Sequence, residues 1–230
     1  METKKTIFFI VEGKTDKTAL EIIFKRIYKN KNINFEFTNG DITSNDNITK
    51  SNICDKIYDM VKRYIDDNKL KKTDIWQIVQ IFDTDGTYIP DSAIIKGDTD
   101  YFLYSTNQIS CKEPEKIKLR NKNKSEKMNY LLSINNIRDI PYKCYYMSSN
   151  LDHALYNMQN LTEDEKRDYA DAFYEAFQDK EQLFITFLKH DVVNGVPDRF
   201  TASWNYIKQN LHSLERHTNL HIFFNENPYI

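Results

Sequence analysis

Two apolar runs, each stopping at acidic residues, constrain the fold of this chain most strongly. Residues 6–11 (TIFFIV) end at Glu12, and residues 76–82 (WQIVQIF) end just before Asp83 and Asp85. Apolar runs of this length are typical of strands that are buried on both faces, as in a parallel sheet covered by helices. Both runs therefore predict central strands with carboxylates at their carboxyl ends.

Helical and strand patterns alternate through the first two thirds of the chain. Apolar residues at helical spacing follow Glu12, and a stretch of period-2 alternation follows them. Such alternation predicts an α/β fold with a small, Rossmann-like, mainly parallel sheet. Residues 87–124 are expected to be irregular. The other expected elements are strands over 33–37 and 143–147 and helices over 51–68 and 125–136.

The pattern changes near residue 155. Thr162 and Glu165 have the spacing of a helix capping box, and further helical segments follow, including one over 199–213. We therefore expect an α/β domain over residues 1–155 and a helical C-terminal region over residues 156–230.

The composition excludes several classes of protein. The net charge of −2, from 32 basic and 34 acidic residues, gives no overall positive field for nucleic acid, so any such binding requires a local patch. Cys54, Cys111 and Cys144 never form a CxxC pair, which argues against a disulfide framework and a structural zinc site. No apolar stretch approaches the ~18 residues of a membrane span. These features predict a soluble cytoplasmic protein without a membrane partner.

The GKT sequence after the first apolar run matches only the last letters of a phosphate-binding loop. Such a loop requires a glycine five positions before Gly13, and Phe8 stands there, within the expected strand. We therefore expect no nucleotide-binding loop, although Lys14 remains a candidate phosphate contact. A calcium-binding EF-hand loop is also excluded, because aligning Gly86 with its invariant glycine puts Ile81 at the first ligand position.

Glu12, Asp83 and Asp85 are expected at one edge of the sheet, where the carboxyl ends of parallel strands meet. Three carboxylates this close repel one another strongly unless a divalent cation lies among them. Oxygen ligands without His or Cys favour Mg²⁺ or Mn²⁺ over zinc. Asp16 shares a helix face with Glu12 if the helix has begun there, which would extend the set to a second ion. Each acid taken alone is more often a turn former or a helix cap.

These residues resemble the signature of the TOPRIM domain, which occurs in topoisomerases, primases and several nucleases. The signature consists of a glutamate at the end of the first strand, here Glu12, and a DxD at the end of a later strand, here Asp83 and Asp85. The resemblance covers roughly residues 5–155. It implies a small Rossmann-like sheet that binds magnesium, so that residues 1–155 would form a TOPRIM-like metal-binding catalytic domain.

Within that superfamily the chain is most similar to the nuclease branch. Asp16, and the absence of topoisomerase or primase regions, resemble the overcoming-lysogenisation-defect type and small abortive-infection proteins of bacterial phage defence. That branch carries a further acid after a later strand, for which Asp152 is the candidate and a helix cap the alternative. It also uses a lysine near the metals, and the sequence does not rank Lys143, Lys189 and Lys208 for this role.

The resemblance implies a metal-dependent endonuclease that cleaves phosphodiester bonds of DNA or RNA with Mg²⁺ or Mn²⁺. Two ions would straddle the scissile phosphate, with Glu12 as ligand or general base and with Asp83 and Asp85 as metal ligands. It also implies a role in antiviral defence by abortive infection, in which a partner defence protein could take part.

Two other functions remain open. The segment IFDTDGT also matches haloacid-dehalogenase-like phosphatases, in which Asp83 is the nucleophile and Asp85 the general acid. However, that nucleophile normally lies on an early strand, and no late acidic pair is evident. In the second alternative the acids bind a metal that stabilises a non-catalytic subunit, and the aromatic helical region docks a partner.

A basic run over residues 112–127 offers a local patch for nucleic acid. It holds seven Lys or Arg and three Glu residues, without interleaved aromatic residues. The run is either a solvated loop or a surface that contacts phosphates. In the second case Lys118 and Arg120 join Lys14 as substrate-binding residues.

Overall fold

A computed structural model describes residues 4–29, 31 and 33–227. In these ranges six strands form a sheet in the order β2-β1-β3-β8-β7, with β9 paired to β8. β1, β2, β3 and β8 run parallel, whereas β7 and β9 lie antiparallel to β8. The predicted α/β fold with a mainly parallel sheet is therefore confirmed. The strands span Lys5–Val11 (β1), Ile33–Asn39 (β2), Ile75–Asp83 (β3), Asn136–Ile137 (β7), Ile140–Ser148 (β8) and His217–Thr218 (β9).

Successive residues of β1 enter two different cores. Phe9 and Val11 belong to the core on one face of the sheet, and Phe8 and Ile10 belong to the core on the other. All four side chains are at most 1% exposed. The strand is thus buried on both faces, as its apolar run predicts.

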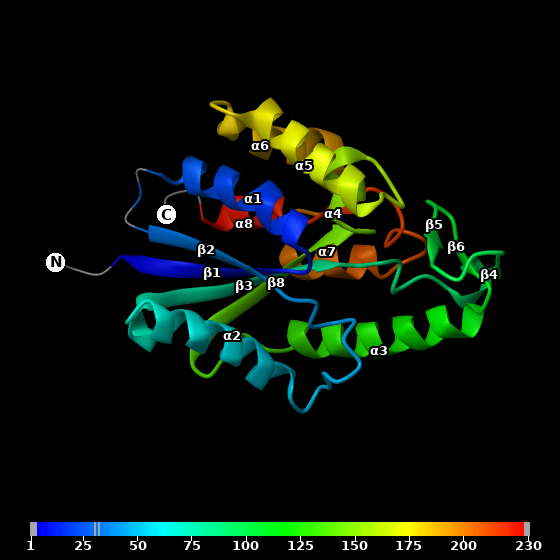
Figure 1. The fold of residues 1–230 in the computed structure, drawn as a ribbon, viewed down its shortest axis with the longest axis horizontal. Helices are drawn as coiled ribbons and strands as arrows, with labels where there is room; N and C mark the ends of the chain where they lie inside the picture. The colour runs from blue at the N-terminus through cyan, green and yellow to red at the C-terminus, as the bar shows by residue number, and fades with distance from the viewer. Residues whose placement is uncertain (1–3, 30, 32, 228–230) are drawn as a thin grey trace.

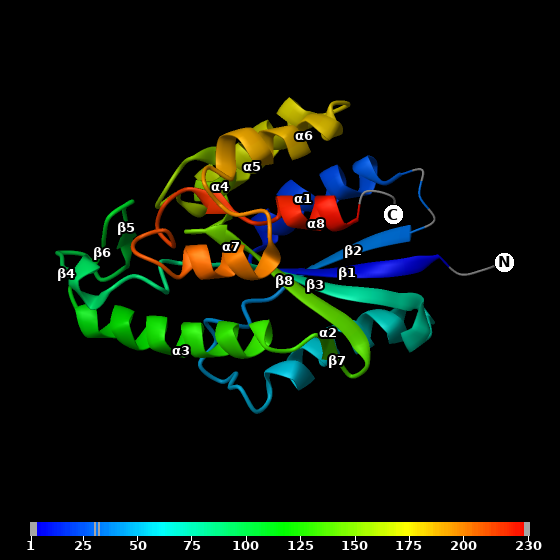
Figure 2. The same ribbon diagram turned by 180° about the vertical axis from the view of Figure 1, so that it is seen from behind.

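Helices cover both faces of the sheet (Figures 1 and 2). α1, α4, α5, α6 and α8 lie on one face, and α2, α3 and α7 lie on the other. The helices span Lys14–Ile27 (α1), Ile53–Asp67 (α2), Pro114–Leu132 (α3), Leu151–Tyr156 (α4), Glu163–Phe177 (α5), Glu181–Phe187 (α6), Phe200–Ile207 (α7) and His221–Glu226 (α8), with 3₁₀ turns at Lys72–Asp74 and Asp91–Ala93 and a π turn at Leu188–Val192.

A small second sheet lies beyond the carboxyl ends of the central strands (Figure 1). It consists of β4 (Ile94–Lys96), β5 (Leu103–Tyr104) and β6 (Ile109–Cys111), in the order β4-β6-β5. The expectation that residues 87–124 are irregular is therefore wrong. The segment folds because residues such as Ile109 build a small core of their own beneath it.

The basic run is helical, which also corrects an expectation. α3 begins at Pro114 rather than near residue 125. Proline is favoured in the first turn of a helix, because its fixed φ and missing N–H cost nothing there. The buried residues of α3 recur at helical spacing and include Ile117, Lys124 and Met128. A lysine on this buried stripe concealed the helical pattern, since lysine is normally a surface residue.

The described residues after 155 are mostly helical, as expected, but they also complete the sheet. β9 pairs with the end of β8, and α8 places Phe223 and Phe224 in the same core as α1. α7 ends at Ile207, and the chain then turns instead of remaining helical to residue 213. The division of the chain at residue 155 stays a prediction.

A helix that crosses a membrane must be both long and apolar. Among the helices of the described ranges, none is both long enough and apolar enough to cross a membrane.

Candidate active site

Seven carboxylates line one cavity at the carboxyl edge of the sheet, and two of them, Asp41 and Glu163, were not expected from the sequence. Glu12 follows β1, Asp83 ends β3, and Asp152 lies in α4 just after β8. Together with Asp16 in α1 and Asp85 after β3, they line a cavity of about 350 Å³, here called the acidic cavity. The structure thus brings together all five acids that the sequence singles out.

The turn that carries Asp85 is held by two other parts of the chain. The Asp85 N–H donates to the Ser149 carbonyl at 2.5 Å, and the Gly86 N–H donates to the Ser213 carbonyl at 3.1 Å. The Thr84 hydroxyl also donates to the Ser213 carbonyl, at 2.8 Å. Asp85 has a φ of 49° and Gly86 a φ of 65°. A positive φ is unfavourable for a residue with a side chain, so these hydrogen bonds maintain the conformation of Asp85.

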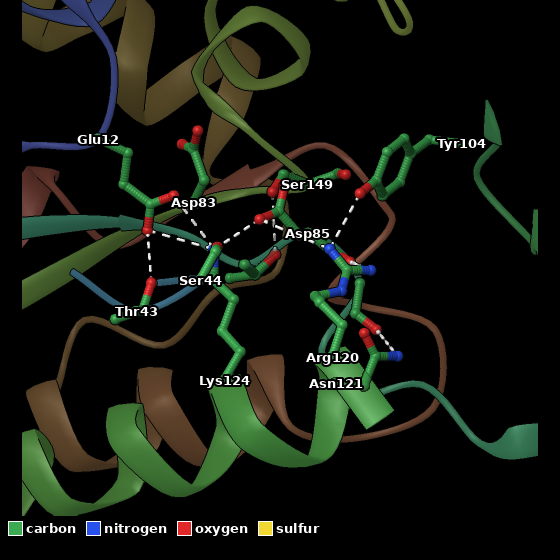
Figure 3. Close-up of polar contacts among 12 residues, drawn as sticks. Glu12, Thr43, Ser44, Asp83, Asp85, Tyr104, Arg120, Asn121, Lys124 and Ser149 are labelled. Carbon is green, nitrogen blue, oxygen red and sulfur yellow. Dashed lines mark hydrogen bonds and ion pairs between the residues drawn. The ribbon is translucent and has the colours of Figure 1, made fainter. Parts of the chain in front are cut away.

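A buried lysine joins two of the acids (Figure 3). Lys124, in the middle of α3, has no exposed side-chain surface. Its Nζ lies 3.2 and 3.1 Å from the two carboxylate oxygens of Glu12, and 2.5 Å from Oδ2 of Asp85. It also lies 3.3 Å from the Ser44 hydroxyl, while Glu12 accepts a 2.9 Å hydrogen bond from Thr43. One ammonium thus bridges the acids that follow β1 and β3.

Arg120, about one helical turn before Lys124, holds Asp85 from another side. Its guanidinium donates to the Asp85 carbonyl at 2.9 Å and to the Tyr104 hydroxyl at 2.9 Å, and lies 3.7 Å from Oδ2 of Asp85. Of the other predicted substrate-binding residues, Lys14 lines the acidic cavity. Lys118 does not, and pairs instead with a neighbouring glutamate of α3.

Asp85 and Glu12, the two carboxylates that contact Lys124, differ in how readily they take up a proton. Burial raises the pKa of Asp85, but Lys124 and Arg120 outweigh burial and hold this pKa below its usual value. Burial also raises the pKa of Glu12, to about 7, although Lys124 opposes the shift. Burial disfavours the Lys124 ammonium, but Asp85 and Glu12 outweigh it and raise the lysine pKa. Lys124 is therefore charged at neutral pH.

The acids that do not contact Lys124, which are Asp16, Asp83 and Asp152, form a part of the cavity with an excess of negative charge. Burial, with the neighbouring Asp16 and Glu12, raises the pKa of Asp83 well above its usual value. Burial raises the pKa of Asp152 to about 6 and also raises the pKa of Asp16. Lys166, on α5, lines this part but does not outweigh these effects. A bound cation would relieve the repulsion.

Asp16 and Asp83 also have structural roles. Asp16 Oδ2 accepts a 2.7 Å hydrogen bond from the Gly13 N–H at the start of α1. Asp83 Oδ1 accepts a 3.0 Å hydrogen bond from the Leu151 N–H at the start of α4. The helix-capping alternative thus holds for one oxygen of Asp16, which nevertheless lines the cavity.

Asp152 is not the cap of its helix. Asn150 is the N-cap of α4, because its side chain accepts a 2.9 Å hydrogen bond from the His153 N–H. Asp152 lies in the first turn, and its Oδ1 is buried without a hydrogen-bond partner among the described residues. A buried carboxylate oxygen without a donor fits a cation ligand better than a cap.

The donor set fits a hard divalent cation in chemistry and charge. The acids supply only oxygen ligands, which Mg²⁺ prefers. Within the ranges that the structure describes, however, no three His, Cys, Asp or Glu side chains converge as a ready-made metal cage. Mg²⁺ usually keeps several waters and takes one or two carboxylate ligands. Asp16, Asp83 and Asp152, which do not contact Lys124, are the acids from which these ligands would come.

Lys124 and Lys166 are site residues that the sequence analysis did not single out. The lysines considered from the sequence were Lys143, Lys189 and Lys208, and none of them lines the acidic cavity. A signal was present, because Lys124 lies seven residues after Ile117 and four before Met128, on one face of a helix. A lysine at a position that the helical period assigns to the core is therefore a candidate for a buried ion pair.

Comparisons with known proteins add nothing about the chemistry of the site, which is therefore argued from its geometry. No family model matches the chain, and neither curated proteins nor solved structures give a match.

Proposed function

We propose that the protein is a Mg²⁺-dependent nuclease of the TOPRIM type, which cleaves phosphodiester bonds in nucleic acid. The observation that carries the proposal is the meeting of Glu12, Asp83 and Asp85 in one cavity, where buried Lys124 bridges two of them. β1 and β3 are neighbouring parallel strands, so the glutamate and the DxD pair have the strand context of the TOPRIM signature. The Rossmann-like arrangement of the sheet is part of this proposal.

Glu12 and Lys124 have environments that suit roles in hydrolysis. With a pKa of about 7, Glu12 exchanges a proton at neutral pH, as a general base that activates water must do. Lys124 fixes Glu12 relative to Asp85 and would supply a buried positive charge behind these two acids. Lys14, at the start of α1, and Lys166 line the same cavity and would contact phosphate oxygens.

Asp16, Asp83 and Asp152 would hold the metal. Bound there, Mg²⁺ would supply Lewis-acid stabilisation of the charge that develops on the phosphate. The raised pKa values of these acids favour this role, because a cation would restore their ionised form.

The phosphatase alternative requires Asp83 to act as an ionised nucleophile. Burial and its acidic neighbours raise the pKa of Asp83, and one of its oxygens accepts a hydrogen bond from the Leu151 N–H. The hydrogen bond occupies one oxygen of the would-be nucleophile. The pKa shift does not separate the two alternatives, because a bound cation would restore the ionised form of Asp83 in either. The alternative of a non-catalytic subunit that docks a partner shares the metal site and differs only in lacking cleavage.

The test is cleavage of supercoiled plasmid DNA and of unstructured RNA at pH 8 with Mg²⁺ or Mn²⁺. We expect cleavage by the wild type and a loss of about 100-fold or more in Glu12→Gln and in Asp83→Asn. Asp66→Asn, which changes an exposed carboxylate on α2, is the matched control and should retain full activity.

Each alternative has its own outcome. Cleavage at the wild-type rate by Glu12→Gln would refute the assigned site. Hydrolysis of a small phosphomonoester that is lost in Asp83→Asn would support the phosphatase, and stabilisation by Mg²⁺ without any cleavage would support the non-catalytic subunit. The proposed defence role rests on the resemblance alone, and predicts that cells are protected from phage by the wild type but not by Glu12→Gln.

A further inference from the structure

A second cavity lies beside the acidic cavity and is lined by aromatic side chains. It measures about 380 Å³ and includes Tyr101, Phe102 and Tyr104, from the segment of the small sheet. This volume is within the range of about 300–1,000 Å³ that is typical of small-ligand sites. Asn150 and Lys166 line both cavities, so the two adjoin. This cavity is here called the aromatic pocket.

Two of the three aromatic side chains pack against a hydrophobic core, and the third does not. Phe102 and Tyr104 rest against the small core that contains Ile109. Tyr101 belongs to none of the hydrophobic clusters of the described residues, and the residue is 66% exposed. An exposed ring in the wall of a cavity offers a flat apolar face to a ligand.

The wall of the aromatic pocket is fixed relative to Asp85. The Asn160 side chain makes two 2.8 Å hydrogen bonds with the backbone of Tyr104, which tie β5 to the loop before α5. Arg120 lies between Tyr104 and Asp85, and bonds both (Figure 3). Its guanidinium carbon lies 5.3 Å from the centre of the Phe102 ring. A group bound in the pocket is thus held at a set position relative to the acidic cavity.

Lys166, which is ion-paired with Glu163, lies where the two cavities meet. The Lys166 ammonium is 2.9 Å from a Glu163 carboxylate oxygen, and its side chain is 29% exposed. An aromatic surface, a neighbouring lysine and the phosphate position proposed for the acidic cavity match the parts of a nucleotide chain, in which a flat base and a charged phosphate alternate.

We propose that the aromatic pocket is a subsite for one unpaired nucleobase next to the scissile phosphate. The base stacks on Tyr101 beside Phe102, and Lys166 contacts the phosphate that joins this nucleotide to the one in the acidic cavity. The inference rests on the proposed nuclease function and adds a substrate class to it. A base within a duplex has both faces covered by its neighbours, so the substrate is single-stranded or locally unpaired nucleic acid.

Binding tests the subsite without cleavage. Fluorescently labelled single-stranded DNA and RNA of 12 nucleotides, and duplexes of the same sequence, are titrated with protein in Ca²⁺ and again without divalent metal. We expect the wild type to prefer single strands. Tyr101→Ala should weaken single-strand binding by about 5- to 150-fold, because a stacked base contributes about 1–3 kcal/mol.

Two further variants separate stacking from general damage. Tyr101→Trp keeps an aromatic face and should retain tight binding, whereas Tyr101→Leu should not. Trp76→Ala removes another exposed aromatic, 48% accessible and at the opposite end of β3 from Asp83, and should leave binding unchanged. Equal binding by Tyr101→Ala and Trp76→Ala, or no binding of single strands by the wild type, would overturn the subsite.

Cleavage of oligonucleotides with a single abasic position then locates the base. Removing the base that occupies the pocket should slow the wild type by about the factor seen for Tyr101→Ala, and should slow Tyr101→Ala no further. The two proposals can fail separately. Cleavage that needs Glu12 but ignores Tyr101 retains the nuclease and rejects the subsite. Single-strand binding that needs Tyr101, without cleavage in any metal, rejects the nuclease and retains the subsite.

Discussion

The ammonium of Lys124 lies 3.1 Å from Glu12 Oε2 and 2.5 Å from Asp85 Oδ2, and it has no exposed side-chain surface. This contact joins α3 to the ends of β1 and β3. Removing one partner of a buried ion pair leaves an uncompensated charge, which typically costs about 3–5 kcal/mol. The stability of the fold and the geometry of the candidate site therefore depend on the same side chain.

Lys124→Met should lower the free energy of unfolding by about 3 kcal/mol, because Glu12 and Asp85 then repel each other without a cation between them. Urea unfolding followed by circular dichroism at pH 7.5 measures this change. Lys122→Met is the control, since Lys122 is exposed on the same helix. If the two variants unfold at the same urea concentration, the buried bridge is not formed in solution.

Asp83→Asn should stabilise the metal-free protein while abolishing the proposed cleavage. Burial, Asp16 and Glu12 oppose ionisation of Asp83, so at pH 8 a neutral amide removes repulsion and still accepts the hydrogen bond from Leu151. We expect the melting temperature in EDTA to rise by about 2–4 °C, which corresponds to about 1 kcal/mol in a chain of this size. Asp66→Asn should not change it, and a lower melting temperature for Asp83→Asn would contradict the charge excess described for the cavity.

Mg²⁺ should raise the melting temperature of the wild type, because a ligand that binds only the folded state stabilises it by about 2.7 kcal/mol at 100 times its dissociation constant. Asp152→Asn should reduce this shift, and Asp66→Asn should not. Scanning fluorimetry with a MgCl₂ series measures the effect. A NaCl series of matched ionic strength must not reproduce it, since an equal shift would indicate general screening instead of a site.

His153 should make stability fall in mild acid. Burial, with Arg216 and His217 nearby, lowers the pKa of His153 from 6.5 to about 4. Below pH 6.5 the unfolded chain gains a proton on His153 that the folded chain does not. The stability that the neutral His153 contributes is therefore fully present above pH 6.5 and is lost as the pH falls toward 4. Between pH 7 and pH 5 the urea midpoint should fall more for the wild type than for His153→Gln. His190→Gln, at an exposed position, should keep the wild-type slope.

Gly86→Ala should destabilise the protein by about 2 kcal/mol, through positive φ and overpacking. Gly86 has a φ of 65°, and an added Cβ would lie 2.6 Å from Leu214 Cδ2 and 2.8 Å from Ile109 Cδ1. Gly40→Ala is a matched comparison, because its Cβ would meet only the flexible end of Met60, at 2.8 Å. Equal unfolding free energies for the two variants would show that the turn after β3 tolerates a side chain.

The sequence predicted site residues best where a continuous apolar run marks a buried strand. Glu12 and Asp83 could be placed because each ends an apolar run, and a parallel sheet brings such ends to one edge. The helical period of α3 places Lys124 on the buried face, but only the finished fold supplies the two carboxylates that compensate its charge. Thr43 and Ser44 belong to a polar loop without any period, so their contacts with Glu12 and Lys124 are tertiary in origin.

The bonds from the Asp83–Gly86 turn to Ser213 also set an order of events during synthesis. Ser213 lies 129 residues after Thr84, whose hydroxyl it binds. A ribosome that adds about 5–20 residues per second needs roughly 6–26 seconds to cover that stretch. Until then the nascent chain carries its acids without the partner that fixes this turn. The proposed nuclease would therefore lack the full support of its Asp85 turn while its own messenger RNA is still being translated.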